Sequence, residues 1–340
     1  FNDRKLPDQY YKEGWKLLYP ANTYTQSTAD EQTHENKALG ANRFPYDLSG
    51  YMGKDFGKLG TTPMGNSLTA EFAKATVISE QLGADQYTDL LAVSFSSPDY
   101  IGHSYGPNSM EAEDGFLRLD LELGKFFDFL DKTVGAGKYT VFLSADHGVA
   151  HTPEFMTEHK LPGGRIMMNN LTIELNKQLK GKYNIPNIIL YDDNYQIALN
   201  HPAMDSAKIN KKEVITWIME QLSSQPAISR VFPLDQLNTV PLPPTLRSMF
   251  NNGYYPSRSG EIQFILKPNY IDAWNNMGTT HGLWNPYDSH IPMLWYGWGI
   301  RKGKTNRETY MTDITPTLAA MLKIQMPNGS VGKVMEEVLK

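Results

Sequence analysis

Two apolar segments on either side of a long amphipathic helix constrain the fold of this chain most strongly. Residues 89–97 (DLLAVSFSS) and 139–145 (YTVFLSA) are almost continuously apolar, which is typical of strands buried on both faces. Between them, Ser109 can cap a helix that ends near Gly135 and carries an apolar stripe. A strand, a helix and a strand in this order predict a parallel sheet with right-handed crossovers.

The chain as a whole predicts an α/β protein with a mostly parallel sheet flanked by helices. Residues 1–60 are polar and predict an irregular covering segment, and residues 61–191 predict the α/β core. Residues 192–269 predict an inserted or capping portion, and residues 270–340 a return to the core. Further helices are expected over 66–81, 169–182, 205–223 and 312–322, and further strands over 195–199, 228–232, 262–266 and 290–295.

Composition excludes several classes of function. The net charge is -5 and no long basic run occurs, so nucleic acid and anionic membrane surfaces are not expected partners. No apolar run approaches the roughly 20 residues of a membrane-spanning helix. Because the chain has no Cys, a transition metal would have to be held by His, Asp and Glu, which directs attention to its eight histidines.

Acidic and histidine side chains follow both of the predicted strands. Asp99 and His103 lie in the loop expected after the first strand, and Asp146 and His147 come directly after the second. Ligands of open parallel sheets bind at the carboxyl ends of the strands. Each residue alone could be a turn, cap or core residue, but the repetition at neighbouring strand ends favours a shared metal site.

His281 provides a third element. It lies in the loop Thr279–Thr280–His281–Gly282, where glycine and threonine keep an imidazole accessible. Three protein ligands and one open position are what a catalytic zinc requires, and Asp99, His103 and His281 would supply one such set.

Three longer segments carry a resemblance to a known family. They are residues 95–109 (FSSPDYIGHSYGPNS), 142–149 (FLSADHGV) and 278–299 (GTTHGLWNPYDSHIPMLWYGWG). From about residue 61 onward the chain resembles the alkaline phosphatase superfamily, in its type I phosphodiesterase and nucleotide pyrophosphatase branch. Within that branch it is most similar to the bacterial periplasmic zinc-dependent alkaline phosphatases, which are phosphate monoesterases.

This resemblance implies two zinc ions, a small phosphate ester as substrate, and a periplasmic or secreted location. Asp99, His103 and His281 would bind the first zinc, and Asp146 and His147 would bind the second. The family's nucleophile and a further Asp ligand are expected upstream of Phe1. The chain would then be the C-terminal part of the fold, with no catalytic nucleophile of its own, and inactive alone. The complete enzyme is expected to work through a phosphoryl-enzyme.

Two other functions remain open. One is a phosphodiesterase or nucleotide pyrophosphatase on the same metal framework, and the other is a non-catalytic metal-binding remnant. His151 could orient a ligand or lie at the rim, while Asp288 and His290 could orient His281 or cap its loop. The remaining histidines lie in polar stretches and are expected at the solvated surface: His34, His159 and His201.

Overall fold

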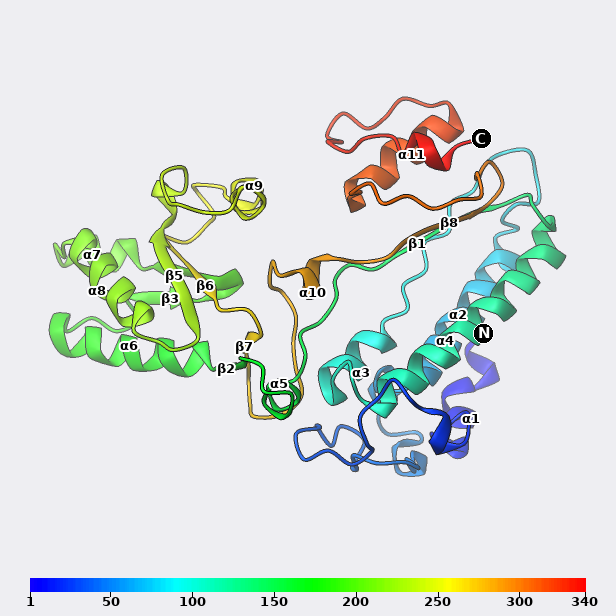
Figure 1. Cartoon of the computed structure of the whole chain (residues 1–340), viewed down its shortest axis with the longest axis horizontal. Coiled ribbons are helices and arrows are strands. Elements are labelled where there is room, and N and C mark those ends of the chain that lie inside the picture. The colour runs from blue at the N-terminus through cyan, green and yellow to red at the C-terminus, as the bar shows by residue number, and fades with distance from the viewer.

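The structure, a computed structural model, describes all residues from Phe1 to Lys340. Figure 1 shows a helical part around α2 and α4 at one end of the molecule and a sheet subdomain at the other. The helices are α1 (Leu6–Glu13), α2 (Pro63–Ser79), α3 (Ser97–Tyr105), α4 (Met110–Leu130), α5 (Pro153–Glu158), α6 (Met168–Tyr183), α7 (His201–Ser206), α8 (Lys211–Ser223), α9 (Pro244–Gly253), α10 (Pro286–Ser289) and α11 (Ile314–Leu322). The strands are β1 (Thr140–Ser144), β2 (Gly164–Ile166), β3 (Ile189–Tyr191), β4 (Gln196–Leu199), β5 (Ile228–Pro233), β6 (Ile262–Leu266), β7 (Tyr270–Asp272) and β8 (Met293–Gly297).

The helical part is organised by capping and by apolar periodicity. Ser109 caps α4, because its Oγ accepts a hydrogen bond from the N–H of Ala112 at 3.1 Å. Val77 of α2 packs with Phe126 and Leu130 of α4 in one buried cluster. The apolar stripe of α4 is only partly covered, since Phe116 is 60% exposed.

The first sixty residues fold over α3 and the start of α4. They contain α1 and short 3-10 turns, and Trp15 pairs with Tyr46 through two backbone hydrogen bonds of 3.0 and 2.8 Å. Both rings join a buried cluster with Ile101 and Tyr105 of α3. This aromatic packing holds an otherwise irregular segment against the helix that carries two of the predicted donors.

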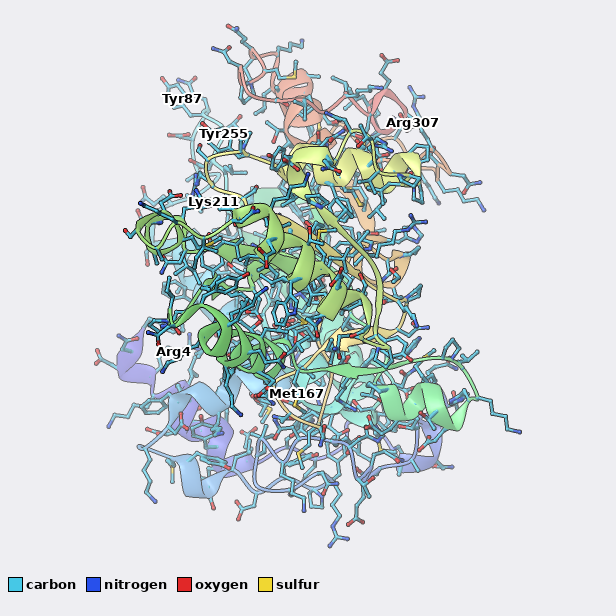
Figure 2. All side chains as sticks on the ribbon, turned by 90° about the vertical axis from the view of Figure 1, so that its left-hand side faces the viewer. Arg4, Tyr87, Met167, Lys211, Tyr255 and Arg307 are labelled. Atoms are coloured by element: carbon cyan, nitrogen blue, oxygen red, sulfur yellow. The ribbon has the colours of Figure 1, made fainter.

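The sheet subdomain is antiparallel. Its strands lie in the order β3-β4-β6-β5, and every residue of the central strand β6 is buried. Phe264 of β6, Leu179 of α6 and Val214 of α8 belong to one core. Figure 2 looks onto this subdomain, with Lys211 labelled at the start of α8 and Tyr255 just after α9. Helix α6 and strand β3 belong to it, although they precede residue 192.

The predicted parallel sheet is wrong in this structure. Residues 89–96 form no strand, Leu90 is 76% exposed, and β1 pairs with β8 in antiparallel register from Thr140 opposite Gly297 to Ser144 opposite Met293. Only β2 and β7 pair in parallel. The reason is physical: an apolar run indicates burial, but a strand also needs a neighbouring backbone, and periodicity does not identify that neighbour.

Several predicted elements are confirmed with small shifts. The expected helices over 169–182 and 312–322 correspond to α6 and α11, and the strand over 262–266 is β6. The helix expected over 205–223 is divided into α7 and α8, because Asn210 begins a new helix by accepting from the N–H groups of Lys212 and Glu213. None of the helices combines the length and the apolar character that crossing a membrane requires.

Candidate metal centre

Asp99 and His103 lie on a helix and not in the predicted loop. Pro98 is in the first turn of α3, and Gly106 ends the helix with a φ of 89° while its N–H donates to the carbonyl of Gly102. Residues four apart lie on one face of a helix, so both side chains point the same way. The Nε2 atom of His103 is 3.4 Å from Oδ1 of Asp99.

The loop that carries His281 is fastened to the end of α3. The N–H of Thr279 donates to the carbonyl of His103 at 3.1 Å, and Nδ1 of His103 lies 2.9 Å from the carbonyl of Thr279. Gly278 has a φ of 61°, and a Cβ there would lie 2.0 Å from the carbonyl oxygen of His103. Only glycine fits this approach, which brings Nε2 of His281 to 3.4 Å from Oδ1 of Asp99.

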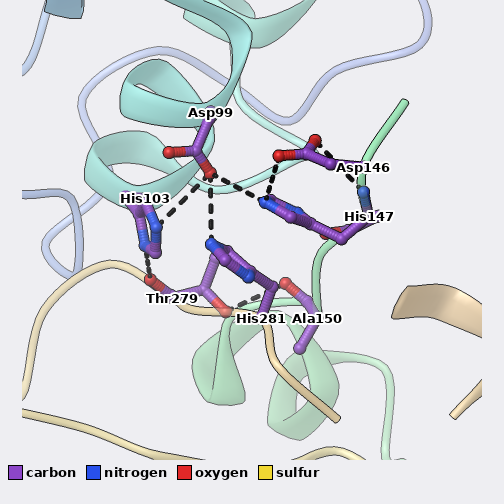
Figure 3. Close-up of polar contacts among 8 residues, drawn as sticks. Asp99, His103, Asp146, His147, Ala150, Thr279 and His281 are labelled. Atoms are coloured by element: carbon purple, nitrogen blue, oxygen red, sulfur yellow. Dashed lines mark hydrogen bonds and ion pairs between the residues drawn. The ribbon is translucent and has the colours of Figure 1, made fainter. Parts of the chain in front are cut away.

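Asp146 and His147 come to the same place from the end of β1. Nε2 of His147 lies 3.4 Å from Oδ2 of Asp146 and 3.9 Å from Oδ1 of Asp99. Nδ1 of His147 is 2.8 Å from the carbonyl of Gly148. The chain turns at Gly148 so close to the carbonyl oxygen of Tyr287 that a Cβ would lie 2.1 Å from it. Figure 3 shows the imidazoles of His103, His147 and His281 gathered around the Asp99 carboxylate.

The donor set of Asp99, His103 and His281 fits a metal ion of zinc size. Their ligand atoms all lie within 4.8 Å of one another. Two ligands at about 2.0–2.1 Å from a tetrahedral zinc are about 3.4 Å apart, and both histidine Nε2 atoms stand at 3.4 Å from the Asp99 oxygen. A carbonyl beside Nδ1 of His103 orients the ring so that Nε2 is left as the donor.

The protonation state of His281 suits this role. Burial lowers the pKa of His281, and the nearby His147 lowers it further. The rings of His147 and His281 are stacked, with centroids 3.4 Å apart and planes inclined by 12°. A metal binds the neutral imidazole, so the site keeps His281 in the form that binding requires.

The loops of the site are supported by Arg165, which the sequence did not assign to it, and by Asp288, for which capping of the His281 loop was one of two expectations. Nη2 of Arg165 donates to the carbonyl of Gly278 at 2.7 Å, and Nη1 donates to Glu154 at 2.5 Å. Oδ2 of Asp288 accepts from the N–H of Leu283 at 2.7 Å, and its backbone carbonyl accepts from Gly148 at 2.6 Å. Asp288 therefore caps the His281 loop and ties it to the His147 loop. No local signal marks Arg165, because its partner lies 113 positions away.

The other histidines lie outside the donor set. Nδ1 of His151 is 2.6 Å from Oδ1 of Asn108, and His290 and His159 are exposed. Nε2 of His201 is 2.6 Å from Glu261. His34, predicted at the surface, is only 9% exposed, because its segment folds against the Gly278 loop and its carbonyl accepts from the N–H of Gly278 at 2.8 Å.

Comparison with known proteins shows which family and which proteins this chain is similar to. The family model described as type I phosphodiesterase / nucleotide pyrophosphatase matches residues 3–284. Alkaline phosphatase PafA of Elizabethkingia meningoseptica is 43% identical over 343 residues, which cover 100% of this chain and 62% of the relative. Alkaline phosphatase PhoV of Synechococcus elongatus is 41% identical over 343 residues, with the same coverage of 100% and 62%.

A solved structure agrees with the fold. The crystal structure of wild-type alkaline phosphatase PafA matches with a TM-score of 0.95 at 42% identity, covering 100% of this chain and 65% of that chain. The chain thus spans less than two thirds of the length of these relatives.

Proposed function

This chain belongs to the type I phosphodiesterase/nucleotide pyrophosphatase family, and we propose that it is the metal-binding part of a zinc-dependent phosphate monoester hydrolase of the alkaline phosphatase kind. The observation that carries the proposal is the placement of His103 and His281, each with Nε2 at 3.4 Å from the same oxygen of Asp99. Identities of 43% and 41% to two alkaline phosphatases favour a monoesterase over a phosphodiesterase.

In this proposal the five donors divide between two zinc ions. Asp99, His103 and His281 hold one ion, and Asp146 and His147 contribute to the second. Bound zinc would supply positive charge to the phosphate oxygens and would lower the pKa of a hydroxyl group beside it. The chain's own part is to hold the donors in place through the loops fastened by Gly278, Gly148 and Asp288, and that preorganisation is a large share of catalysis by charge.

A phosphoryl-enzyme also needs a nucleophile. The five donors make no hydrogen bond with a Ser or Thr hydroxyl, and the hydroxyl of Thr279 donates to the carbonyl of Ala150 at 2.9 Å. This observation, with the coverage of only 62% of each of the two relatives, supports a nucleophile that lies outside these 340 residues, and we expect the chain alone to have little activity. Each missing oriented electrostatic element commonly costs about 10²- to 10³-fold in rate.

The test combines metal analysis with turnover. The dialysed chain should retain zinc, His103→Ala should lose most of it, and His159→Ala, which changes an exposed histidine, should not. Hydrolysis of an aryl phosphate monoester and of the matching diester should stay near background at about pH 8–9, where the histidines are neutral. A chain without zinc would contradict the metal site, and robust turnover abolished by Thr280→Ala would place the nucleophile inside the chain.

A further inference from the structure

Two buried carboxylates lie outside the metal centre, where the N-terminal segment meets α3 and α4. Glu111 in the first turn of α4 is 0% exposed, and Glu35 in the N-terminal segment is 1% exposed. Tyr46 and Tyr105 are buried beside them, with ring centroids 5.9 Å apart. The surroundings are the aromatic cluster that fastens the first sixty residues to α3.

These carboxylates lack the partners that buried charges normally have. Oε1 of Glu111 accepts from the Tyr46 hydroxyl at 2.5 Å, but Oε2 is buried without a hydrogen-bond partner. Oε2 of Glu35 accepts only from the N–H of Gln32, at 3.2 Å. No Lys, Arg or His forms an ion pair with either carboxylate. The Tyr105 hydroxyl, on a residue that is 1% exposed, is also without a partner.

The electrostatics make this arrangement costly at alkaline pH. Burial, together with the nearby charge of Glu111, raises the pKa of Glu35 to about 8. Burial likewise raises the pKa of Glu111 to about 7 against the Tyr46 hydrogen bond, with Asp30 and Asp114 adding to it. The nearby Arg118 is already paired with Asp114 at 2.7 Å, and Asp30 accepts from the N–H of Phe44. No cation is therefore left over for Glu35 and Glu111. An uncompensated buried charge costs several kcal/mol, on the order of the whole stability of a domain.

The position of the Tyr105 hydroxyl indicates what kind of ligand could compensate the buried negative charge of Glu35 and Glu111. The Tyr46 hydroxyl donates to Glu111, and the ring centroid of Tyr46 is 5.9 Å from that of Tyr105. The N–H of Asn36, next to Glu35, donates to the carbonyl of Ser104, next to Tyr105, at 2.8 Å. The buried Tyr105 hydroxyl, which has no partner, therefore lies where the segments of the two carboxylates meet. Carboxylate oxygens together with neutral oxygen donors are the ligands of hard cations. Calcium tolerates irregular oxygen geometry from loops, whereas magnesium demands a near-ideal octahedron.

We propose that a hard divalent cation of the calcium class binds between Glu35 and Glu111, with the Tyr105 oxygen as a further donor. The cation neutralises both carboxylates and uses Oε2 of Glu111. It also fastens residues 30–46 to the end of α3.

A cation bound at Glu35 and Glu111 would also stabilise the positions of the residues that form the metal centre. The N–H of Asn36, next to Glu35, donates to the carbonyl of Ser104 at 2.8 Å. The carbonyl of His34, on the other side of Glu35, accepts from the N–H of Gly278 at 2.8 Å. One short segment therefore touches both the helix of His103 and the loop of His281, so that a cation at Glu35 acts on the placement of the zinc donors.

The experiment uses the zinc-saturated full chain, so that Asp99 and its histidines are already occupied. Calcium titrated at about pH 8.5 should raise the melting temperature by several degrees, and at about pH 5.5 the rise should vanish because protons then occupy the carboxylates. Terbium, a luminescent substitute for calcium, should be sensitised through Tyr46 and Tyr105. Glu35→Gln and Glu111→Gln should each weaken both effects by about 10- to 100-fold, whereas Glu80→Gln, at an exposed site, should not.

Two results would overturn the proposal. In the first, calcium leaves the melting temperature unchanged at both pH values and terbium shows no sensitised luminescence. Glu35 and Glu111 would then be protonated or hydrated and would bind no cation. The other is a calcium effect that persists in both Gln variants, which would put the cation elsewhere. If a Gln variant fails to fold, the comparison of the two pH values on the unaltered chain still decides.

Discussion

At the scale of single residues, the donors could be predicted and their surroundings could not. The sequence motifs around them predict one donor set of Asp99, His103 and His281. In the structure the ligand atoms of these three residues lie within 4.8 Å of one another. The burial of His34 was missed because its neighbours in sequence, Thr33 and Glu35, are polar. What covers it comes from the Gly278 loop, which no local pattern reveals.

The buried His34 predicts a pH effect on stability. Burial lowers the pKa of His34 below the ordinary 6.5, although Glu154 and Glu158 act in the opposite direction. The unfolded chain then binds a proton at this residue more readily than the folded chain, so the free energy of unfolding should decrease as pH falls below about 6.5. Urea unfolding of the metal-free chain between about pH 5 and 7.5 measures this dependence.

His34→Gln should make that dependence shallower, since it removes one titrating group, while burial also lowers the pKa of His151 and of His281. His159→Gln is the matched control, because His159 is exposed and should leave the slope as it was. A His34→Gln curve that coincides with the original would show that other groups cause the effect.

At the scale of secondary-structure elements, periodicity and capping predicted what depends on local sequence. The α4 helix begins after the Ser109 cap as expected, and α6 and β6 lie within a residue or two of their predicted bounds. The sequence predicted a loop where α3 lies, because Pro98 is typical of turns as well as of helix starts and Gly102, in the middle of the helix, is typical of turns. The loop-to-helix contact at Gly278 depends on residues far apart and left no periodic signal.

That contact gives a prediction at the same scale. Gly278→Ala should destabilise the chain and weaken zinc binding, because φ is 61° and the added Cβ would lie 2.0 Å from the His103 carbonyl. The left-handed conformation alone costs a non-glycine residue about 1–3 kcal/mol, before the steric overlap is added. The free energy of unfolding and the zinc affinity measure the two effects.

Gly181→Ala is the matched control. Gly181 lies in α6, and nothing lies within 4 Å of its added Cβ, so alanine there should be neutral or stabilise the helix by about 0.5–1 kcal/mol. Equal behaviour of the two variants would mean that the approach of Gly278 to His103 is not required.

At the scale of the whole molecule, the α/β class was predicted correctly and the sheet arrangement was not. The β1–β8 pair consists of two strands only, so each leaves one edge without a partner. Leu294 and Tyr296 of β8 are 60% and 54% exposed, and Phe116 of α4 is 60% exposed. Figure 1 shows this pair running between α4 and α11 as a ribbon, without a wider sheet around it.

These exposed features predict self-association of the isolated chain. Unpaired strand edges and large apolar surfaces are the features through which soluble proteins associate. Size-exclusion chromatography at increasing concentration should show dimers or larger species, and Leu294→Lys should reduce them. A monomer at every concentration, with a sharp melting transition, would contradict the prediction.

The contact between His103 and Thr279 also has a consequence for the order of events during folding. The two residues are 176 positions apart, and closing a flexible loop of that length costs about 5 kcal/mol in chain entropy. Contacts of such long range form only after the local helices and hairpins have lowered that entropic cost. His281 therefore reaches Asp99 and His103 only when both halves of the chain have been ordered. If the proposed zinc site is correct, the time at which zinc is captured during refolding reports the last step of assembly.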